Sequence, residues 1–249
     1  MSDNKFTVDG SSAIVTGASS GIGRRIAEGF AAQGVDTTIC SREQDNVDPV
    51  AEEINDGDAP GRVLPIECDV RDRDSVEAMV ETTVDELGGL EILVNNVGLA
   101  RGEGVEDLST EDYRLMMDVN VDGYFFPTRE ALPHVRDSGG TLVFIGSFAG
   151  QYPRPVNPVY AATKWWVRGF AKSVSADVGE DDVAVTVINP AEVRTEFGGD
   201  DGEAFEDRFE PGEVSEPEEI AAAVRFAAEQ DPSMVSELDL YRRDKLTFF

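Results

Sequence analysis

The sequence predicts an α/β fold, a doubly wound parallel sheet of about seven strands with helices on both faces. Short apolar runs rich in β-branched residues alternate along the chain with longer amphipathic segments, as is typical of parallel strands joined by helices. The first apolar run also leads directly into a glycine-rich turn and a helix-like segment. In such sheets ligands bind at the carboxyl ends of the strands, where the strand order reverses. We therefore expect the functional residues at strand ends.

Each predicted element follows from its length and periodicity. Strand-like runs occupy residues 12–16, 37–40, 63–68, 92–95, 141–145, 183–188 and 235–241. Helix-like segments occupy residues 22–33, 48–55, 74–87, 110–134, 159–178 and 217–229. Several of these helices open with Asp, Ser or Thr, which cap helix N-termini. Because no internal repeat or interdomain linker is visible, we expect one domain over residues 1–249.

The composition is strongly acidic, with 50 Asp and Glu against 21 Lys and Arg and a net charge of -29. This charge repels nucleic acid phosphates and anionic lipid surfaces, so neither nucleic acid nor a membrane is an expected partner. The acids are spread along the whole chain, and the basic residues are mostly Arg. That pattern suggests adaptation to high salt and a halophilic source, because salt screens the repulsion between carboxylates. An acidic protein from an ordinary source is the alternative.

Other classes of protein are disfavoured by what the chain contains. No segment approaches the roughly 20 apolar residues of a membrane span, and the opening run from Met1 to Lys5 does not begin a signal peptide, so a soluble, cytoplasmic protein is expected. The cysteines, Cys40 and Cys68, are too far apart for a CxxC motif, so we expect neither a disulfide framework nor a metal site. His134 is the only histidine, which leaves no histidine-based triad.

Two motifs carry the chemistry. The first is the turn Thr16-Gly17-Ala18-Ser19-Ser20-Gly21-Ile22-Gly23, in which glycines allow a tight turn and a close approach of the backbone to a pyrophosphate at a helix N-terminus. The second joins Tyr160 and Lys164, one helical turn apart, with Ser147 at the end of an apolar run. A nearby ammonium stabilises tyrosinate and lowers the phenol pKa, while a serine hydroxyl can bond an oxygen whose charge changes. Taken alone, each motif could be a plain turn or a surface pair.

Together these residues resemble the short-chain dehydrogenase/reductase family over nearly the full length of the chain. The matches, in the family's order and at its usual intervals, are the run from Thr16 to Gly23, Cys68-Asp69-Val70, Asn95-Asn96-Val97-Gly98, Asn120, Ser147, Tyr160, Lys164 and Asn189-Pro190. The resemblance implies a single-domain Rossmann-type fold and an NAD(P)-dependent oxidoreductase. The chain departs from the family at Val97, where Ala is usual, and at Ala191, where Gly is usual. Both changes add small apolar bulk and are expected to tighten the nicotinamide site without abolishing it.

The resemblance also implies which residues bind the cofactor. They are Gly17, Ser19, Ser20, Gly21, Ile22, Gly23, Ser41, Arg42, Asp69, Val70, Asn95, Gly98, Tyr160, Lys164, Pro190, Val193 and Thr195. The glycine turn would hold the phosphates, Asp69 would bond the adenine amino group, and Pro190 would flank the nicotinamide. Asn95 and Gly98 would support the adenosine half.

The choice between NAD and NADP depends on the end of the second strand. Ser41 can donate to a 2′-phosphate and Arg42 can neutralise it, as in the NADP-dependent members that this segment resembles. Glu43 follows directly, and Ser20 takes a place that is often basic in NADP-using relatives. NADP(H) is therefore favoured and NAD(H) is the alternative, with Arg42 then a surface residue paired with Glu43.

For catalysis, the resemblance implies a tetrad of Asn120, Ser147, Tyr160 and Lys164. Tyr160 would exchange a proton with the substrate oxygen, Ser147 would orient that oxygen, and Lys164 would lower the phenol pKa and bond the nicotinamide ribose. Asn120 would hold a water that connects Lys164 to solvent. The reaction is hydride transfer between the cofactor and a carbonyl or secondary alcohol. A non-catalytic nucleotide-sensing protein on the same fold is the alternative from another class.

The substrate stays open between 3-oxoacyl thioesters or other ketones and sugars, polyols or secondary alcohols. Its pocket is expected from residues 99–104, 148–157 and 193–213, with residues 194–213 as a mobile lid or, equally, an acidic surface segment of a halophilic protein. Arg101 or Arg154 could contact an anion, although a solvent-facing structural role is favoured for each. Trp165 and Trp166 are expected in the core or at a subunit contact. In the family the helix that carries them commonly forms a dimer face, so a homo-oligomer is expected, a tetramer with a dimer as the alternative.

Overall fold

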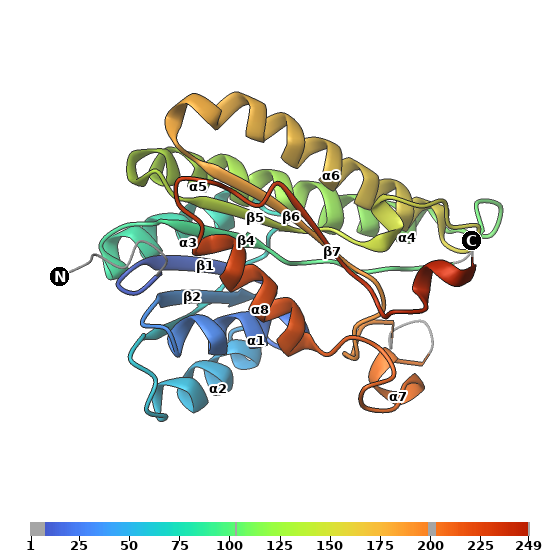
Figure 1. The fold of residues 1–249 in the computed structure, drawn as a ribbon, viewed down its shortest axis with the longest axis horizontal. Coiled ribbons are helices and arrows are strands. Elements are labelled where there is room, and N and C mark those ends of the chain that lie inside the picture. The colour runs from blue at the N-terminus through green and yellow to red at the C-terminus, as the bar shows by residue number, and fades with distance from the viewer. Residues whose placement is uncertain (1–7, 103, 199–202, 249) are drawn as a thin grey trace.

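The computed structural model describes residues 8–102, 104–198 and 203–248, which fold into a seven-stranded sheet with helices on both faces (Figure 1). The strands are β1 (Ser12–Thr16), β2 (Asp36–Ser41), β3 (Val63–Glu67), β4 (Ile92–Asn95), β5 (Thr141–Ile145), β6 (Ala184–Pro190) and β7 (Glu237–Leu240). Every neighbouring pair is parallel. The predicted doubly wound parallel sheet is confirmed.

The order of the strands places the site. It runs β3-β2-β1-β4-β5-β6-β7, so the chain builds outward from β1 in one direction and then returns to add β4 on the other side of β1. Val15 of β1 pairs with Val94 of β4 at this reversal. The carboxyl ends of β1 and β4 therefore form the point at which ligands bind in open sheets of this type.

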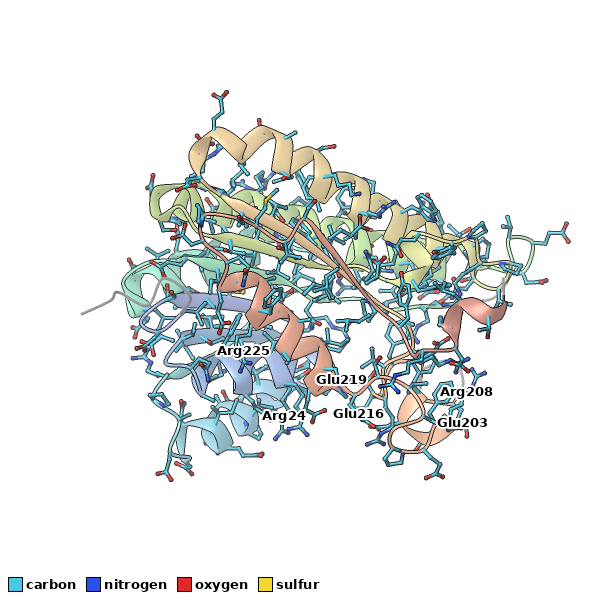
Figure 2. All side chains as sticks on the ribbon, viewed as in Figure 1. Arg24, Glu203, Arg208, Glu216, Glu219 and Arg225 are labelled. Carbon is cyan, nitrogen blue, oxygen red and sulfur yellow. The ribbon has the colours of Figure 1, made fainter. Side chains whose placement is uncertain are left out.

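The helices are α1 (Gly21–Ala31), α2 (Gln44–Asn55), α3 (Arg73–Leu87), α4 (Thr110–Met117), α5 (Gly123–Ser138), α6 (Pro158–Val178), α7 (Phe205–Arg208) and α8 (Pro217–Ala228). Short 3-10 turns occupy Phe148–Gly150, Gly179–Asp181 and Lys245–Phe248. A capping box starts α8, where the backbone N–H of Glu216 donates to Glu219 across 2.9 Å; Figure 2 labels both residues. None of the described helices combines the length and the apolar character that crossing a bilayer requires.

One of the predicted helices is divided into separate parts in the structure. The sequence predicts one helix over residues 110–134, whereas the structure has α4, a π-helical turn over Asp118–Asp122 and then α5. The turn surrounds Asn120, whose side chain bonds the backbone of Leu99 instead of facing solvent. A π-turn inserts a residue into the helix and re-aims the side chains that follow it. Gly139, with φ of 63°, then ends α5.

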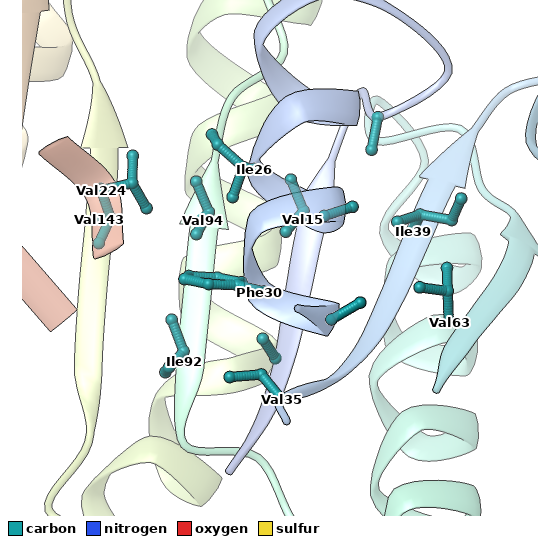
Figure 3. Close-up of a cluster of buried hydrophobic side chains, with 14 of the residues drawn as sticks. Val15, Ile26, Phe30, Val35, Ile39, Val63, Ile92, Val94, Val143 and Val224 are labelled. Carbon is teal, nitrogen blue, oxygen red and sulfur yellow. The ribbon is translucent and has the colours of Figure 1, made fainter. Parts of the chain in front are cut away.

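Two cores lie on opposite faces of the sheet, because successive strand side chains point to opposite sides. On one face, α1 and α8 cover Val15 and its neighbours, and Phe30 of α1 is 1% exposed; Figure 3 shows this cluster. On the other face, α3, α5 and α6 cover Ile14 and Phe144. Full burial of a side chain such as Phe30 contributes about 1.5–3 kcal/mol. Both faces of the sheet are thus packed, which leaves the strand ends as the open edge.

Candidate active site

A cavity of about 660 Å³ opens at the carboxyl ends of the strands. Residues from the ends of β1, β2, β5 and β6 line it, together with the segments that follow β3 and β4. This volume lies within the range of small-molecule and cofactor sites. The predicted position of the site, at the reversal of strand order, agrees with this cavity.

The glycine turn forms one wall, and its shape depends on missing side chains. Gly17 and Gly21 have φ of 64° and 52°, a region that glycine enters without strain. A Cβ on Gly23 would lie 2.4 Å from the carbonyl oxygen of Gly17. Ser20 caps α1 without a side-chain hydrogen bond, so the first-turn amides of α1 are left for the cavity side. Such a turn can hold the phosphates of a dinucleotide.

Asn96 fixes the turn from behind. Its Nδ2 donates to the carbonyl oxygens of Thr16 and Gly17, each across 2.9 Å, and its backbone N–H donates to Thr16 Oγ1 across 3.0 Å. The sequence placed Asn96 in a matching motif without giving it this role. Only the pairing of β1 with β4 brings the two segments together.

The part of the cavity where β2 and β3 end is lined by Ser41, Arg42, Asp69 and Arg71 among others. Asp69 accepts from Arg71 Nη2 across 2.6 Å and from Arg71 Nε across 2.8 Å. This hydrogen bonding, with a smaller contribution from the charge of Arg42, lowers the pKa of Asp69 below its ordinary value. Ser41 Oγ donates to the carbonyl oxygen of Glu43 across 2.7 Å. Arg42 is exposed and forms no salt bridge with Glu43 within the described part of the chain.

Tyr160 and Lys164 lie in the first turns of α6. Asn157, with φ of 60°, caps this helix by accepting from the backbone N–H of Tyr160 across 3.2 Å. Tyr160 is 7% exposed and Lys164 is 4% exposed, and both line the cavity. Burial raises the pKa of Tyr160, while a hydrogen bond with Ser147 and the charge of Arg154 act in the opposite direction. The pKa of the Tyr160 phenol therefore depends both on its burial and on the polar and charged groups beside it.

Lys164 has two hydrogen-bond partners on neighbouring elements. Its Nζ donates to Tyr124 Oη and to the carbonyl oxygen of Ile145, each across 3.0 Å. Burial lowers the pKa of Lys164 to about 7. Burial is also the largest influence on the pKa of Tyr160, which is raised, and Lys164 is not among the groups that shift it in this structure.

Asn120 and Ser147 are held by backbone contacts. Asn120 Oδ1 accepts from Leu99 N across 2.9 Å, and its Nδ2 donates to Leu99 O across 2.8 Å and to Thr163 Oγ1 across 3.2 Å. The π-turn thus ties α6 to the segment after β4. Ser147 Oγ accepts from Ala149 N across 3.1 Å at the start of a 3-10 turn. Ser147 and Tyr160 face the same cavity.

Beside Tyr160 the cavity has aromatic walls. Phe197 lies 5.8 Å from Tyr160 and 5.8 Å from Phe205, between ring centroids, and both phenylalanines line the cavity. These two belong to the segment expected to act as a lid, of which residues 199–202 lie outside the described residues, as does residue 103 of the expected pocket. Residues from all three expected pocket segments line the cavity.

Charged side chains also line the cavity. Arg154 lines the cavity, whereas Arg101 is not among the lining residues. Lys245, near the end of the chain, is ion-paired with Glu192 and lies 4.7 Å from the ring centroid of Phe148. The sequence missed Lys245, since nothing local connects it to a residue 53 positions earlier.

Most of the predicted site residues line one cavity. These are Gly17, Ser19, Ser20, Gly21, Ile22, Ser41, Arg42, Asp69, Val70, Gly98, Ser147, Tyr160, Lys164, Pro190, Val193 and Thr195. Gly23, Asn95 and Asn120 lie behind the lining, and Asn95 Nδ2 donates to Thr128 Oγ1 across 3.1 Å. Trp166 is partly buried, stacks on Phe170 at 4.7 Å and packs against the core, whereas Trp165 is 45% exposed. The described residues contain no cluster of His, Cys, Asp or Glu suited to a metal ion.

Comparison with known proteins identifies relatives along almost the whole chain. A family model described as short chain dehydrogenase matches residues 11–205. The chain is 32% identical over 244 residues to a D-threitol dehydrogenase of Mycolicibacterium smegmatis, which covers 96% of this chain and 93% of the relative. It is 35% identical over 219 residues to an NADP-dependent 3-hydroxy acid dehydrogenase of Shigella flexneri, covering 85% and 86%. The crystal structure of a 3-ketoacyl-(acyl-carrier-protein) reductase from Brucella melitensis complexed with NADH superposes with a TM-score of 0.84 and 29% identity, covering 94% of this chain and 98% of that one.

Proposed function

The chain belongs to the short-chain dehydrogenase/reductase family, and on this premise we propose that it transfers a hydride between NADP(H), in preference to NAD(H), and a carbonyl or secondary-alcohol substrate. The observation that carries the proposal is the meeting of Ser147, Tyr160 and Lys164 with the glycine turn at one cavity. The turn supplies a phosphate site, and the three side chains supply a hydroxyl, an acid/base and a cation.

The residues present fit a dinucleotide. The backbone at Gly17 and Gly21 adopts conformations that glycine allows, and Gly23 packs where a Cβ would collide. The phosphates are held by Gly17, Ser19, Ser20, Gly21, Ile22 and Gly23. Asp69 and Val70 bind the adenine, with Asn95 and Gly98 in support, and Pro190, Val193 and Thr195 flank the nicotinamide. When bound, the nicotinamide supplies or accepts the hydride.

Tyr160 moves the proton. In reduction its hydroxyl gives a proton to the substrate oxygen, and in oxidation its phenolate removes one. Ser147 donates a hydrogen bond to the same oxygen and favours the form that carries developing negative charge. Arg154 aids the phenolate form, because its charge lowers the Tyr160 pKa against the effect of burial.

Lys164 and Asn120 support this transfer. The Lys164 ammonium bonds the nicotinamide ribose and favours tyrosinate. Asn120, in the π-turn, holds a water that connects Lys164 to solvent. A cation in a dry site acts more strongly on a nearby phenol than it would in water. Cofactor binding thereby supplies the environment in which Lys164 lowers the Tyr160 pKa.

We base the cofactor preference on Arg42, the residue after β2, because the Ser41 hydroxyl donates to the carbonyl oxygen of Glu43. Arg42 is exposed at the cavity and has no salt bridge within the described residues, so it is available for the 2′-phosphate of NADP. An Arg to phosphate contact is a charge-assisted hydrogen bond. The 3-hydroxy acid dehydrogenase relative is NADP-dependent, whereas the reductase structure from Brucella melitensis holds NADH.

The substrate is either a 3-hydroxy or 3-oxo acid derivative or a polyol. Arg154 at the cavity favours an anionic substrate, and the aromatic walls of Phe197 and Phe205 favour an apolar acyl chain. The D-threitol dehydrogenase relative favours a polyol. We infer that residues 194–213 close over the bound substrate and that the enzyme is a homo-oligomer, a tetramer in preference to a dimer.

The test is a nicotinamide absorbance assay at molar KCl that crosses both cofactors with panels of ketones, 3-oxoacyl thioesters, 3-hydroxy acids, sugars and secondary alcohols. The expected result is cofactor-dependent turnover of at least one carbonyl and alcohol pair, with a higher kcat/KM for NADP(H). Absence of cofactor binding by fluorescence titration, together with absence of turnover, would overturn the proposal.

A further inference from the structure

A second buried tyrosine contacts the site, and it belongs to none of the predicted motifs. Tyr124 is the second residue of α5, just after the π-turn, and its side chain is fully buried against Phe144 of β5. Its hydroxyl lies 2.8 Å from the carbonyl oxygen of Ile145 and 3.0 Å from Lys164 Nζ. Ile145 is the last residue of β5, two positions before Ser147.

The directions of these hydrogen bonds follow from the chemistry of the groups. A charged ammonium only donates and a carbonyl oxygen only accepts. The Tyr124 O–H therefore donates to Ile145 O, and the Tyr124 oxygen accepts from Lys164. Lys164 also donates to Ile145 O across 3.0 Å, so its ammonium has two acceptors in a closed triangle. One of its three N–H groups is left for the cavity.

We propose that Tyr124 is a positioning residue for the redox reaction: its hydroxyl holds Lys164 Nζ at the cavity wall and stabilises the charged form of that side chain. The inference rests on the proposed function only for its effect on turnover. The nitrogen lies 5.0 Å from the centroid of the Tyr124 ring but only 3.0 Å from its hydroxyl oxygen, so the contact is made through the hydroxyl.

The hydroxyl matters because Lys164 is buried. Burial lowers the pKa of Lys164 to about 7, so the ammonium is near the point of losing its proton at neutral pH. An acceptor on a buried charged group favours the charged form. The titratable groups that face Lys164 are Tyr124 from α5 and Tyr160 from α6, and burial raises the pKa of both phenols. The charge of Arg154 lowers the pKa of Tyr160, although Arg154 is not one of the groups that face Lys164.

The variant Tyr124→Phe removes one oxygen and keeps the ring. We expect kcat to fall about tenfold, with the KM for the carbonyl or alcohol substrate changed less than about twofold, since one hydrogen bond to a charged group is lost. The alkaline limb of the kcat profile should move to lower pH, because Lys164 loses its proton sooner. Tyr113→Phe, at an exposed position on α4, is the matched control and should leave both unchanged.

A direct measurement separates this inference from the proposed function. Lysine occurs only at positions 5, 164, 172 and 245, so labelling lysine with carbon-13 at Cε gives a short set of NMR signals. In the wild type the Lys164 signal should titrate near pH 7, and in Tyr124→Phe its midpoint should fall by about half a unit or more. This result needs no turnover. An unchanged midpoint and an unchanged kcat profile would overturn the inference.

A double variant keeps the test decisive if Tyr124→Phe unfolds. If the loss of stability comes from an ammonium without its acceptor, adding Lys164→Met should restore the Tm. If the double variant stays as unstable as Tyr124→Phe, Tyr124 acts only through packing and the inference fails.

Discussion

Gly23 of α1 packs so closely on Gly17 that a Cβ atom on Gly23 would lie 2.4 Å from the Gly17 carbonyl oxygen. The same atom would lie 2.6 Å from Asn96 Nδ2, the group that fixes the turn. The start of α1, the end of β1 and the segment after β4 are therefore in contact through a position that tolerates no side chain. The shape of the glycine turn depends on this contact.

Gly23→Ala should destabilise the protein by roughly 1–3 kcal/mol, because backbone must move to admit the methyl group. Cofactor affinity should fall with it, since the turn is displaced. Gly29→Ala in the same helix is the control: nothing lies within 4 Å of its Cβ, and alanine should stabilise α1 by about 0.5–1 kcal/mol. Thermal unfolding and cofactor titration check both. Equal behaviour of the two variants would contradict the packing described for the turn.

Arg42→Ala should weaken NADPH binding about 10- to 100-fold and leave NADH binding nearly unchanged, because only NADPH offers the 2′-phosphate. Arg62→Ala serves as control, since Arg62 is ion-paired with Glu86 on the surface and does not line the cavity. Fluorescence titration with both nucleotides gives the comparison. An equal loss for NADH and NADPH would show that Arg42 does not select the cofactor.

Lys164→Met should raise the Tm at pH 6 while abolishing most activity. The pKa of Lys164 is about 7 in the folded protein against an ordinary 10.5, so between these values the unfolded chain binds more protons. The contribution of Lys164 to the free energy of unfolding therefore rises as the pH rises from about 7 to 10.5. The cost of burying its charged ammonium is largest below pH 7. The Tm gain of the variant should shrink toward pH 10. Lys172→Met, half-exposed, should show no such trend. A gain independent of pH would contradict the lowered pKa.

The Tm should rise steeply with KCl, and activity should collapse in dilute buffer. With a net charge of -29, repulsion between carboxylates opposes the folded state until the Debye length falls to about 3 Å near 1 M salt. Differential scanning fluorimetry across a KCl series checks this, with sucrose as an uncharged comparison. Full stability and activity without salt would remove the case for halophilic adaptation.

The strands could be predicted because their signal is local. The run from Ser12 to Thr16 is buried throughout and reads as an apolar segment without knowledge of its neighbours. The break in the helix at Asp118–Asp122 could not be predicted, because its cause is the contact of Asn120 with Leu99, 21 positions away. Helical periodicity continues on both sides of the π-turn, so the pattern shows no interruption.

The site was predictable as far as its motifs extend. Tyr160 and Lys164 lie one turn apart on α6 as expected, and the glycine turn lies at the same cavity. The partners of these residues were not predictable. Tyr124 and Ile145 meet Lys164 only after α5 and α6 pack on the same face of the sheet, and Lys245 reaches Glu192 only through the path of β7. The direction of the Tyr160 pKa depends on this burial, which the sequence does not specify.

The most direct test of the account compares the wild-type protein with Tyr160→Phe, at molar KCl, with the cofactor and substrate that the panel assay identifies. Tyr160 alone is assigned the proton transfer. Nicotinamide absorbance should show kcat lowered at least about 100-fold in the variant, while fluorescence titration shows the cofactor Kd within about threefold of the wild type. Turnover by Tyr160→Phe at the wild-type rate, with cofactor bound, would contradict the assignment of Tyr160 as the acid/base.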